Sequence, residues 1–318
     1  MGVGLDDIRR AAERIRGRVL RTPLRRSEWL STADRSVHFK LEAIQPTCSY
    51  KIRGAFNAAL SLRERETGRP RLVTASAGNH GRAMAFAARE LDLPLTVFIA
   101  ADAPRAKIDA IRAAGAELRE CGDYDEAEHE AKRHAASGAG LFISPYSHPN
   151  VIAGAGTVGL ELLDDLPSTD AVVVPIGGGG LISGIGIAVK GLSPSTRVIG
   201  VEVAASCPFT RSLEAGRLVT IDVKPSLADG LTGNLDPDTI TLDIVREVVD
   251  EIVLVEEDDL RRGLAAVVTN EHLVIEGAAA AGPAALVTGK LNVDGNIAVI
   301  LSGANIDADR LVDVLRWV

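Results

Sequence analysis

Short runs of β-branched and aliphatic residues alternate with alanine-rich amphipathic runs along most of the chain. This alternation constrains the fold more than any other feature. When each strand is followed by a helix, the strands pair with one another in parallel. From Ala171 onward several strands are apolar on both faces, as a sheet covered by helices on both sides requires. The sequence therefore predicts an α/β fold with mostly parallel sheets. Strands are expected at Val37–Leu41, Leu72–Ala75, Leu95–Ile99, Leu118–Glu120, Ala171–Pro175, Val198–Val203, Ile252–Val255 and Ile297–Leu301.

The strand–helix units fall into two groups, one from about Leu72 to Phe142 and one from about Ala171 onward. Ser144–Asn150 contains two prolines and no periodicity, which predicts a crossover between the groups. A length of 318 residues fits two domains. We expect a large domain of residues 1–60 and 147–318, a small domain of residues 61–146, and the active site between them. Helices are expected at Gly81–Glu90, Pro104–Ala114, Tyr124–Ala136 and Asp258–Thr269, and irregular structure at Pro208–Asp238.

The overall charge excludes some classes of partner. Acidic residues outnumber basic ones by 43 to 35, which gives a formal net charge of −8, whereas a nucleic-acid binder needs a basic face. No apolar run approaches the roughly 20 residues that span a bilayer. Cys48, Cys121 and Cys207 match no zinc motif and cannot form a disulfide framework. We therefore expect a cytoplasmic protein with reduced thiols and neither nucleic acid nor membrane as a partner.

The strongest local motif is VVVPIGGGGLISGIG at Val172–Gly186, in which four glycines separate a buried strand from a helix. Glycines let successive backbone N–H groups turn toward one point, and a helix N-terminus favours an anion. The motif lacks the Lys-Ser/Thr of a Walker loop, and Ile182 breaks the dinucleotide-binding pattern. It therefore predicts a phosphate site of another kind.

Three further segments carry polar groups close to strand ends. In TCSYKIRGA, Lys51 lies among apolar neighbours ahead of a helix, where its charged form is disfavoured and its amine can form a Schiff base. In TASAGNHG, Asn79 offers an amide and the loop N–H groups can hold a carboxylate. In LSGANID, Ser302 offers a hydroxyl, although a plain helix cap explains that residue equally well. Ligands of α/β sheets bind at the carboxyl ends of strands, so these segments predict one shared site.

The order of these motifs resembles that of the fold type II pyridoxal-phosphate enzymes, which have a two-lobed fold similar to tryptophan synthase β. The resemblance is to the serine/threonine dehydratase and serine racemase branch. It covers nearly the whole chain, from RTPL at Arg21–Leu24 through SYKIRGA, SAGNHG, VIAGAGT and the tetraglycine loop to SGAN. It implies pyridoxal 5'-phosphate as cofactor, an amino acid as substrate and a homodimer.

The resemblance also implies roles for individual residues. Lys51 would form the internal aldimine, Asn79 would bind the cofactor's ring oxygen, and Ser302 would act as the partner of the pyridine nitrogen. The cofactor phosphate would be bound by Gly177, Gly178, Gly179, Gly180 and the N–H of Leu181. The substrate carboxylate would be received by Ser76, Ala77, Gly78, Asn79 and His80.

The implied reaction is α,β-elimination, in which Lys51 removes the Cα proton of a 3-hydroxy amino acid such as L-threonine or L-serine. The products are a 2-oxo acid and ammonia. A serine racemase is the alternative, but it needs a second acid/base, and Ala77 cannot transfer a proton. A non-catalytic ligand sensor on the same fold is a third possibility, against which the intact Lys51 argues.

Some residues depart from the dehydratase pattern and leave the substrate open. Ala155 replaces a glutamine, and LADGL at Leu227–Leu231 resembles dehydratases associated with hydroxyectoine breakdown. A 3-hydroxyaspartate or a hydroxyectoine-derived amino acid is therefore also considered. An acidic substrate would need a cationic partner, for which Arg53 and Arg82 are the candidates.

A divalent cation site occurs in part of this branch. Glu202 and the carbonyl of Ser206 match its pattern, but Pro208 stands where an acidic ligand is needed. Hard cations take several oxygen ligands, so weak or absent cation binding is expected.

Overall fold

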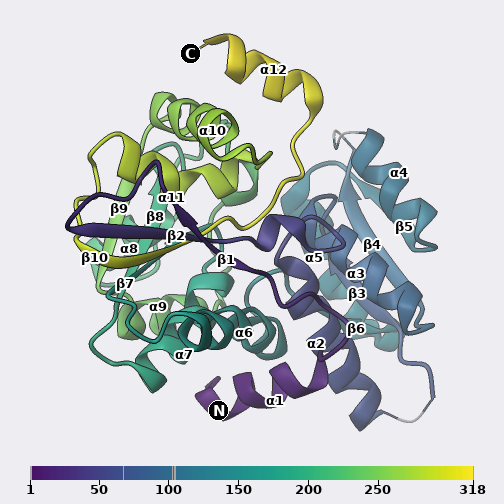
Figure 1. Cartoon of the computed structure of the whole chain (residues 1–318). Coiled ribbons are helices and arrows are strands. Elements are labelled where there is room, and N and C mark those ends of the chain that lie inside the picture. Colours follow the sequence, from purple (N-terminus) through teal and green to yellow (C-terminus); the bar gives the residue numbers. More distant parts are fainter. Residues whose placement is uncertain (1, 67, 102, 104, 318) are drawn as a thin grey trace.

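The computed structural model describes residues 2–66, 68–101, 103 and 105–317, and its strands form two sheets (Figure 1). The larger sheet has the strand order β1-β2-β10-β7-β8-β9 and the smaller one the order β5-β4-β3-β6. The strands are β1 Leu24–Ser27, β2 Arg35–Lys40, β3 Leu72–Ala75, β4 Leu95–Ala100, β5 Glu117–Cys121, β6 Leu141–Phe142, β7 Ala171–Pro175, β8 Arg197–Val203, β9 Glu251–Val255 and β10 Gly295–Ile300.

Helices connect most of the strands. The α-helices are α1 Leu5–Arg14, α2 Lys51–Arg65, α3 Asn79–Glu90, α4 Arg105–Ala113, α5 Tyr124–His134, α6 Pro149–Asp165, α7 Gly180–Leu192, α8 Pro208–Ala215, α9 Thr241–Val248, α10 Glu257–Glu271, α11 Gly277–Val287 and α12 Ala308–Trp317. Short helical segments are η1 Glu42–Ile44, η2 Ala135–Ala139 and η3 Asp229–Leu231.

The six-stranded sheet is parallel except for the antiparallel pair β1 and β2. Successive side chains of a strand point to opposite faces. Val173 and Val299 join the core cluster that includes α10 and α11, whereas Val172 and Ile300 join the cluster that includes α6 and α7. Both faces are therefore buried, as the uninterrupted apolar strands predict.

The four-stranded sheet is parallel throughout and is also covered on both faces. Leu72 and Val97 pack in a cluster with residues of α2 and α3. Val73 and Phe98, one position along each strand, pack with Ala127 of α5. The α/β fold with mostly parallel sheets is confirmed.

The eight expected strands are all present, with ends shifted by at most two residues. The sequence missed β1 and β6, which are four and two residues long, because so few residues carry no usable period. The expectation of irregular structure throughout Pro208–Asp238 was wrong, because Pro208–Ala215 forms α8. Proline suits the first turn of a helix, and Gly216 ends this one at a φ of 67°. The expected helix start at Pro104 lies outside the described residues.

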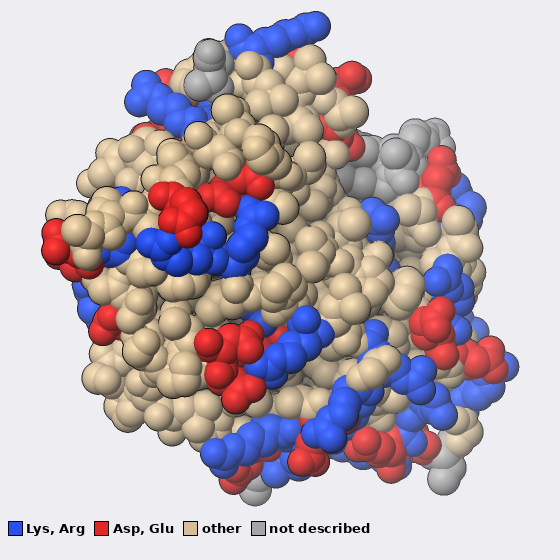
Figure 2. All heavy atoms as spheres, viewed as in Figure 1, with Lys and Arg blue, Asp and Glu red and all other residues tan. Residues whose placement is uncertain are grey.

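Charged side chains of both signs are interspersed on the surface. On the face shown in Figure 2, lysine and arginine side chains lie beside aspartate and glutamate side chains, and no continuous basic surface is seen there. In the described part of the chain, no helix is both long and apolar enough to cross a membrane.

Candidate active site

The tetraglycine loop connects the carboxyl end of β7 to the first turn of α7. Gly179 has a φ of 82°, in the left-handed region that favours glycine. A Cβ atom on Gly178 would lie 2.3 Å from the ring of Tyr146, and one on Gly180 would lie 2.8 Å from the Tyr146 carbonyl oxygen. Conformation and close packing therefore both require glycine here. The N–H groups in the first turn of a helix such as α7 have no partner within the helix and form the kind of site that binds phosphate.

Lys51 is the first residue of α2 and is half-buried. Its Nζ atom donates a hydrogen bond of 2.9 Å to the carbonyl of Pro145 and lies 5.2 Å from the centre of the Tyr50 ring. Pro145 directly precedes Tyr146, whose ring lies against Gly178. The lysine amine is thus connected to the glycine loop through two consecutive residues.

The segment before Lys51 runs against the loop that follows β10. Ser49 forms a β-bridge with Gly303, and the N–H of Tyr50 donates to the carbonyl of Ser302 over 3.0 Å. The Ser302 residue is 3% exposed. Chain segments 250 residues apart in sequence therefore meet directly beside Lys51.

The SAGNHG loop follows β3 and leads into α3 at Asn79. The Oγ atom of Ser76 accepts a hydrogen bond of 3.2 Å from the N–H of Gly78. Gly81 is needed because a Cβ there would lie 1.9 Å from the carbonyl oxygen of Ser76. Ala77 is partly exposed, so the loop presents backbone and a methyl group at the helix N-terminus.

His80 is buried inside the same loop. Its Nε2 atom lies 3.3 Å from the carbonyl of Ile143, and its buried Nδ1 has no hydrogen-bond partner among the described residues. Burial and, to a smaller extent, the positive charge of Lys51 together lower the pKa of His80 to about 3. The imidazole is therefore neutral across the physiological range.

Asn79 makes contacts that the sequence did not indicate. Its Nδ2 atom donates to Oε1 of Glu276 over 2.7 Å, and its Oδ1 atom accepts from Nδ2 of Asn305 over 2.6 Å. Glu276 precedes α11, and Asn305 follows β10. The sequence carried no signal for this meeting, because a glutamate ahead of an alanine-rich helix reads as an ordinary helix start.

Glu202 lies fully buried at the carboxyl end of β8. Its oxygens accept hydrogen bonds from the N–H groups of Phe209 and Thr210 and from the Thr210 hydroxyl, over 2.6–2.9 Å. Burial raises its pKa. The carboxylate therefore caps the N-terminus of α8 and leaves few lone pairs for a cation. The described residues hold no group of three or more His, Cys, Asp or Glu that could bind a metal.

Arg53 does not face the site as a free cation, so the suggestion that it binds an acidic substrate was wrong. Its side chain is fully buried and forms ion pairs with Glu42 and Glu161 at 2.8 and 2.7 Å. Thr157 accepts a further hydrogen bond. Arg82 is exposed and donates to Oδ1 of Asn305 over 2.8 Å.

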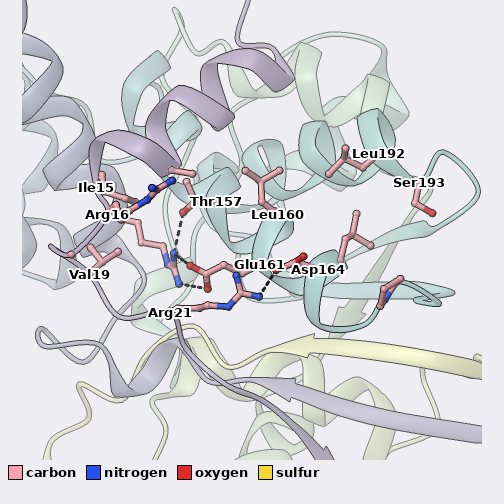
Figure 3. A pocket seen from close by; sticks show the side chains of 15 residues that line it. Ile15, Arg16, Val19, Arg21, Thr157, Leu160, Glu161, Asp164, Leu192 and Ser193 are labelled. Carbon is pink, nitrogen blue, oxygen red and sulfur yellow. Dashed lines mark hydrogen bonds and ion pairs between the residues drawn. The ribbon is translucent and has the colours of Figure 1, made fainter.

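A cavity of about 700 Å³ lies apart from these residues, between the end of α1 and helices α6 and α7 (Figure 3). Ile15, Leu160 and Leu192 line it together with Arg21 and Glu161. Several of its charged groups are paired within the chain: Glu161 binds Arg53, and Arg21 binds Asp164 over 2.7 Å. Apart from Arg53, none of the residues predicted for the site lines this cavity.

The predicted segments thus converge at the carboxyl ends of β3, β7 and β10. A glycine cradle at a helix start, a half-buried lysine amine and a fixed amide are typical of α/β enzymes that hold a phosphate-bearing cofactor. The sequence matches the family described as "Pyridoxal-phosphate dependent enzyme" over residues 15–303. The chain belongs to this family.

Individual relatives cover nearly the whole chain. It is 39% identical to the L-threonine ammonia-lyase of Thermotoga maritima, with 99% of this chain and 78% of that protein aligned. It is 38% identical to the catabolic L-threonine dehydratase TdcB of Escherichia coli, with 99% and 97% aligned. The structure of maize serine racemase superposes with a TM-score of 0.91 at 30% identity and covers 100% of this chain and 98% of that one.

The residues present fit pyridoxal phosphate. The glycine loop offers backbone N–H groups where a side chain would collide with Tyr146. The amine of Lys51 donates to a neutral backbone carbonyl, and it can exchange this hydrogen bond for a covalent bond to a carbonyl carbon. Asn79 is held in place by side chains on both sides.

Proposed function

We propose that this chain is a pyridoxal-phosphate dependent lyase that converts a 3-hydroxy amino acid to a 2-oxo acid and ammonia. The observation that carries the proposal is that Lys51 meets the tetraglycine loop through Pro145 and Tyr146, while the neighbouring Tyr50 meets Ser302. L-Threonine is the first candidate substrate, because both relatives named above are described as acting on it.

Specific residues would hold the cofactor. The N–H groups of Gly177–Gly180 and Leu181 would bind its phosphate, favoured by the positive end of the α7 dipole. Asn79 would donate to its ring oxygen, and Ser302 would contact its pyridine nitrogen. A serine hydroxyl cannot keep that nitrogen protonated as an aspartate would. This favours elimination over chemistry that needs a long-lived carbanion.

Lys51 would carry both covalent attachment and proton transfer. The bound cofactor withdraws electrons from the substrate's α-carbon and makes its proton acidic. The Nζ atom of Lys51, once free, takes that proton as a general base. The β-hydroxyl takes up one proton, which balances the proton that Lys51 has removed, and leaves as water. One water is consumed later, so that the hydroxy amino acid yields one 2-oxo acid and one ammonia.

The SAGNHG loop would orient the substrate. Its backbone N–H groups at the start of α3 favour a carboxylate, so the loop would bind this anion without a charge on the neutral His80. A racemase is the second candidate, because a serine racemase structure superposes over the whole chain. Ala77 argues against it, since a methyl group cannot return a proton to the opposite face of the substrate. Appreciable formation of D-serine from L-serine would refute this assignment.

We also propose a domain organisation, a compartment, an oligomeric state and an independence of divalent cations. Residues 1–60 and 147–318 would form a large cofactor-binding domain, and residues 61–146 a small one. The enzyme would be a cytoplasmic homodimer, which size-exclusion chromatography with light scattering would test. Activation by a divalent cation is not expected, because Glu202 already accepts three hydrogen bonds.

The proposal is tested with purified protein and added pyridoxal phosphate. The wild-type protein should develop a visible absorbance band and release 2-oxo acid and ammonia from at least one member of a panel. The panel contains L-threonine, L-serine, 3-hydroxyaspartate and a hydroxyectoine-derived amino acid. Lys51→Ala should abolish both signals, and Lys290→Ala, which removes a lysine paired with Asp259, should leave both intact. A band without turnover of any of these amino acids would favour a ligand sensor.

A further inference from the structure

Four polar side chains form a continuous row beside the candidate cofactor site. Arg82 donates to Oδ1 of Asn305 over 2.8 Å, and Nδ2 of Asn305 donates to Oδ1 of Asn79 over 2.6 Å. Nδ2 of Asn79 then donates to Oε1 of Glu276 over 2.7 Å. Nδ2 of Asn305 also donates to the carbonyl of Thr47 over 3.0 Å. We call Arg82, Asn305, Asn79 and Glu276 the amide row.

The two ends of the amide row fix the direction of both amides between them. An asparagine side chain can be turned over so that its oxygen and nitrogen exchange places. A guanidinium group can only donate hydrogen bonds, and a carboxylate can only accept them. Arg82 therefore requires the oxygen of Asn305 to face it, and Glu276 requires the nitrogen of Asn79.

The amide row also joins the two sheets of the molecule. Asn79 and Arg82 lie on α3, which packs on the four-stranded sheet. Glu276 precedes α11, and Asn305 follows β10, one of the two central strands of the six-stranded sheet. The direction of the Asn79 amide is thus set by two residues, Glu276 and Asn305, that belong to the side of the molecule built on the other sheet.

We propose that Glu276 and Arg82 are positioning residues that lock the Asn79 amide with its second Nδ2 N–H available to the cofactor's ring oxygen. The proposal rests on the cofactor site of the proposed function. One Nδ2 hydrogen is used by Glu276, and the amide nitrogen has two. With the amide turned over, its oxygen would face the carboxylate of Glu276, and two acceptors would oppose each other.

The variant Glu276→Gln removes one end of the lock while it keeps the shape of the side chain. A glutamine amide can donate or accept, so position 276 no longer dictates the direction of the Asn79 amide, which then depends on Arg82 and Asn305 alone. We expect the Kd for pyridoxal phosphate to rise about fivefold to tenfold, the loss of roughly one net hydrogen bond. The absorbance maximum of the bound cofactor should shift, because a negative charge next to the amide is removed.

Arg82→Gln tests the other end of the amide row. We expect a smaller rise, of about threefold, in the Kd for pyridoxal phosphate, because one further hydrogen bond separates Arg82 from Asn79. Arg82 is exposed, so this variant should fold even if Glu276→Gln does not. Glu271→Gln is the matched control for a buried carboxylate, since Glu271 pairs with Arg25 over 2.7 Å. Arg89→Gln is the control on the exposed side of α3.

The readouts are the Kd from titration of the cofactor-free protein and the absorbance spectrum of the reconstituted protein. Larger Kd values and a shifted band in Glu276→Gln and Arg82→Gln, but not in the two controls, support the positioning role. Values equal to those of the controls overturn it while leaving the proposed function intact. A wild-type protein that binds no pyridoxal phosphate overturns both.

Discussion

Replacing Gly178 by alanine should disrupt the tetraglycine loop through one contact, that with the ring of Tyr146. The added Cβ would lie 2.3–2.7 Å from three atoms of the ring. Carbon atoms in favourable contact are about 3.5 Å apart, so the ring or the loop must move by about 1.2 Å. The ring has little freedom, because the Tyr146 hydroxyl accepts a hydrogen bond of 2.9 Å from the N–H of Asp236.

Overpacking of this kind costs about 1–3 kcal/mol. In Gly178→Ala this free energy should be divided between a lower free energy of unfolding, measured in urea, and a weaker affinity for pyridoxal phosphate. Removing the ring as well should relieve the clash, so Gly178→Ala combined with Tyr146→Ala should lose less than the sum of the single variants. Gly230→Ala is the control, because its Cβ would meet Ala278 at an ordinary 3.5 Å. Additive losses in the double variant would refute the reasoning.

Other predictions concern buried charges. Burial raises the pKa of Glu128 to about 7, so stabilisation by its protonated form is complete below about pH 4.5 and lost as the pH rises through 7. In urea titrations at pH 8, the free energy of unfolding of Glu128→Gln should therefore exceed that of the wild type by on the order of 2 kcal/mol. At about pH 4.5 the two free energies of unfolding should be about equal. Arg53→Met should lower the free energy of unfolding by about 3–5 kcal/mol, because Glu42 and Glu161 lose their partner. The ring resonances of His80 should stay unchanged between pH 8 and 5, and a transition near pH 6.5 would contradict its burial.

Local patterns in the sequence were sufficient to predict most of the fold. The strands Leu72–Ala75 and Ala171–Pro175 were predicted to the residue, because buried parallel strands are continuous apolar runs with turn residues at their ends. The whole of α8 was missed, although Pro208 suits a helix start, because turn residues and prolines dominate the sequence around this short helix. Periodicity is informative only when a segment is long enough to repeat.

The candidate site likewise contains features that a short stretch of sequence reveals and features that depend on residues distant in the chain. The glycine loop and the lysine could be identified because each lies in one short stretch of sequence whose chemistry is unusual. Arg53 was misjudged because a charge near a reactive lysine looks accessible in a sequence, whereas its partners Glu42 and Glu161 lie 11 and 108 residues away. Burial of a charge depends on partners that only folding brings together.

The sequence by itself determined the parallel α/β architecture, and it drew attention to the tetraglycine loop and to Lys51, because each of these features depends on the order of neighbouring residues. The tertiary structure alone decided which groups surround them. It placed the Tyr146 ring against Gly178, and the Glu276 carboxylate and the Asn305 amide on either side of Asn79. Hydrogen bonds and close contacts act over about 3 Å, so residues distant in the chain influence each other only when the fold brings them within that reach.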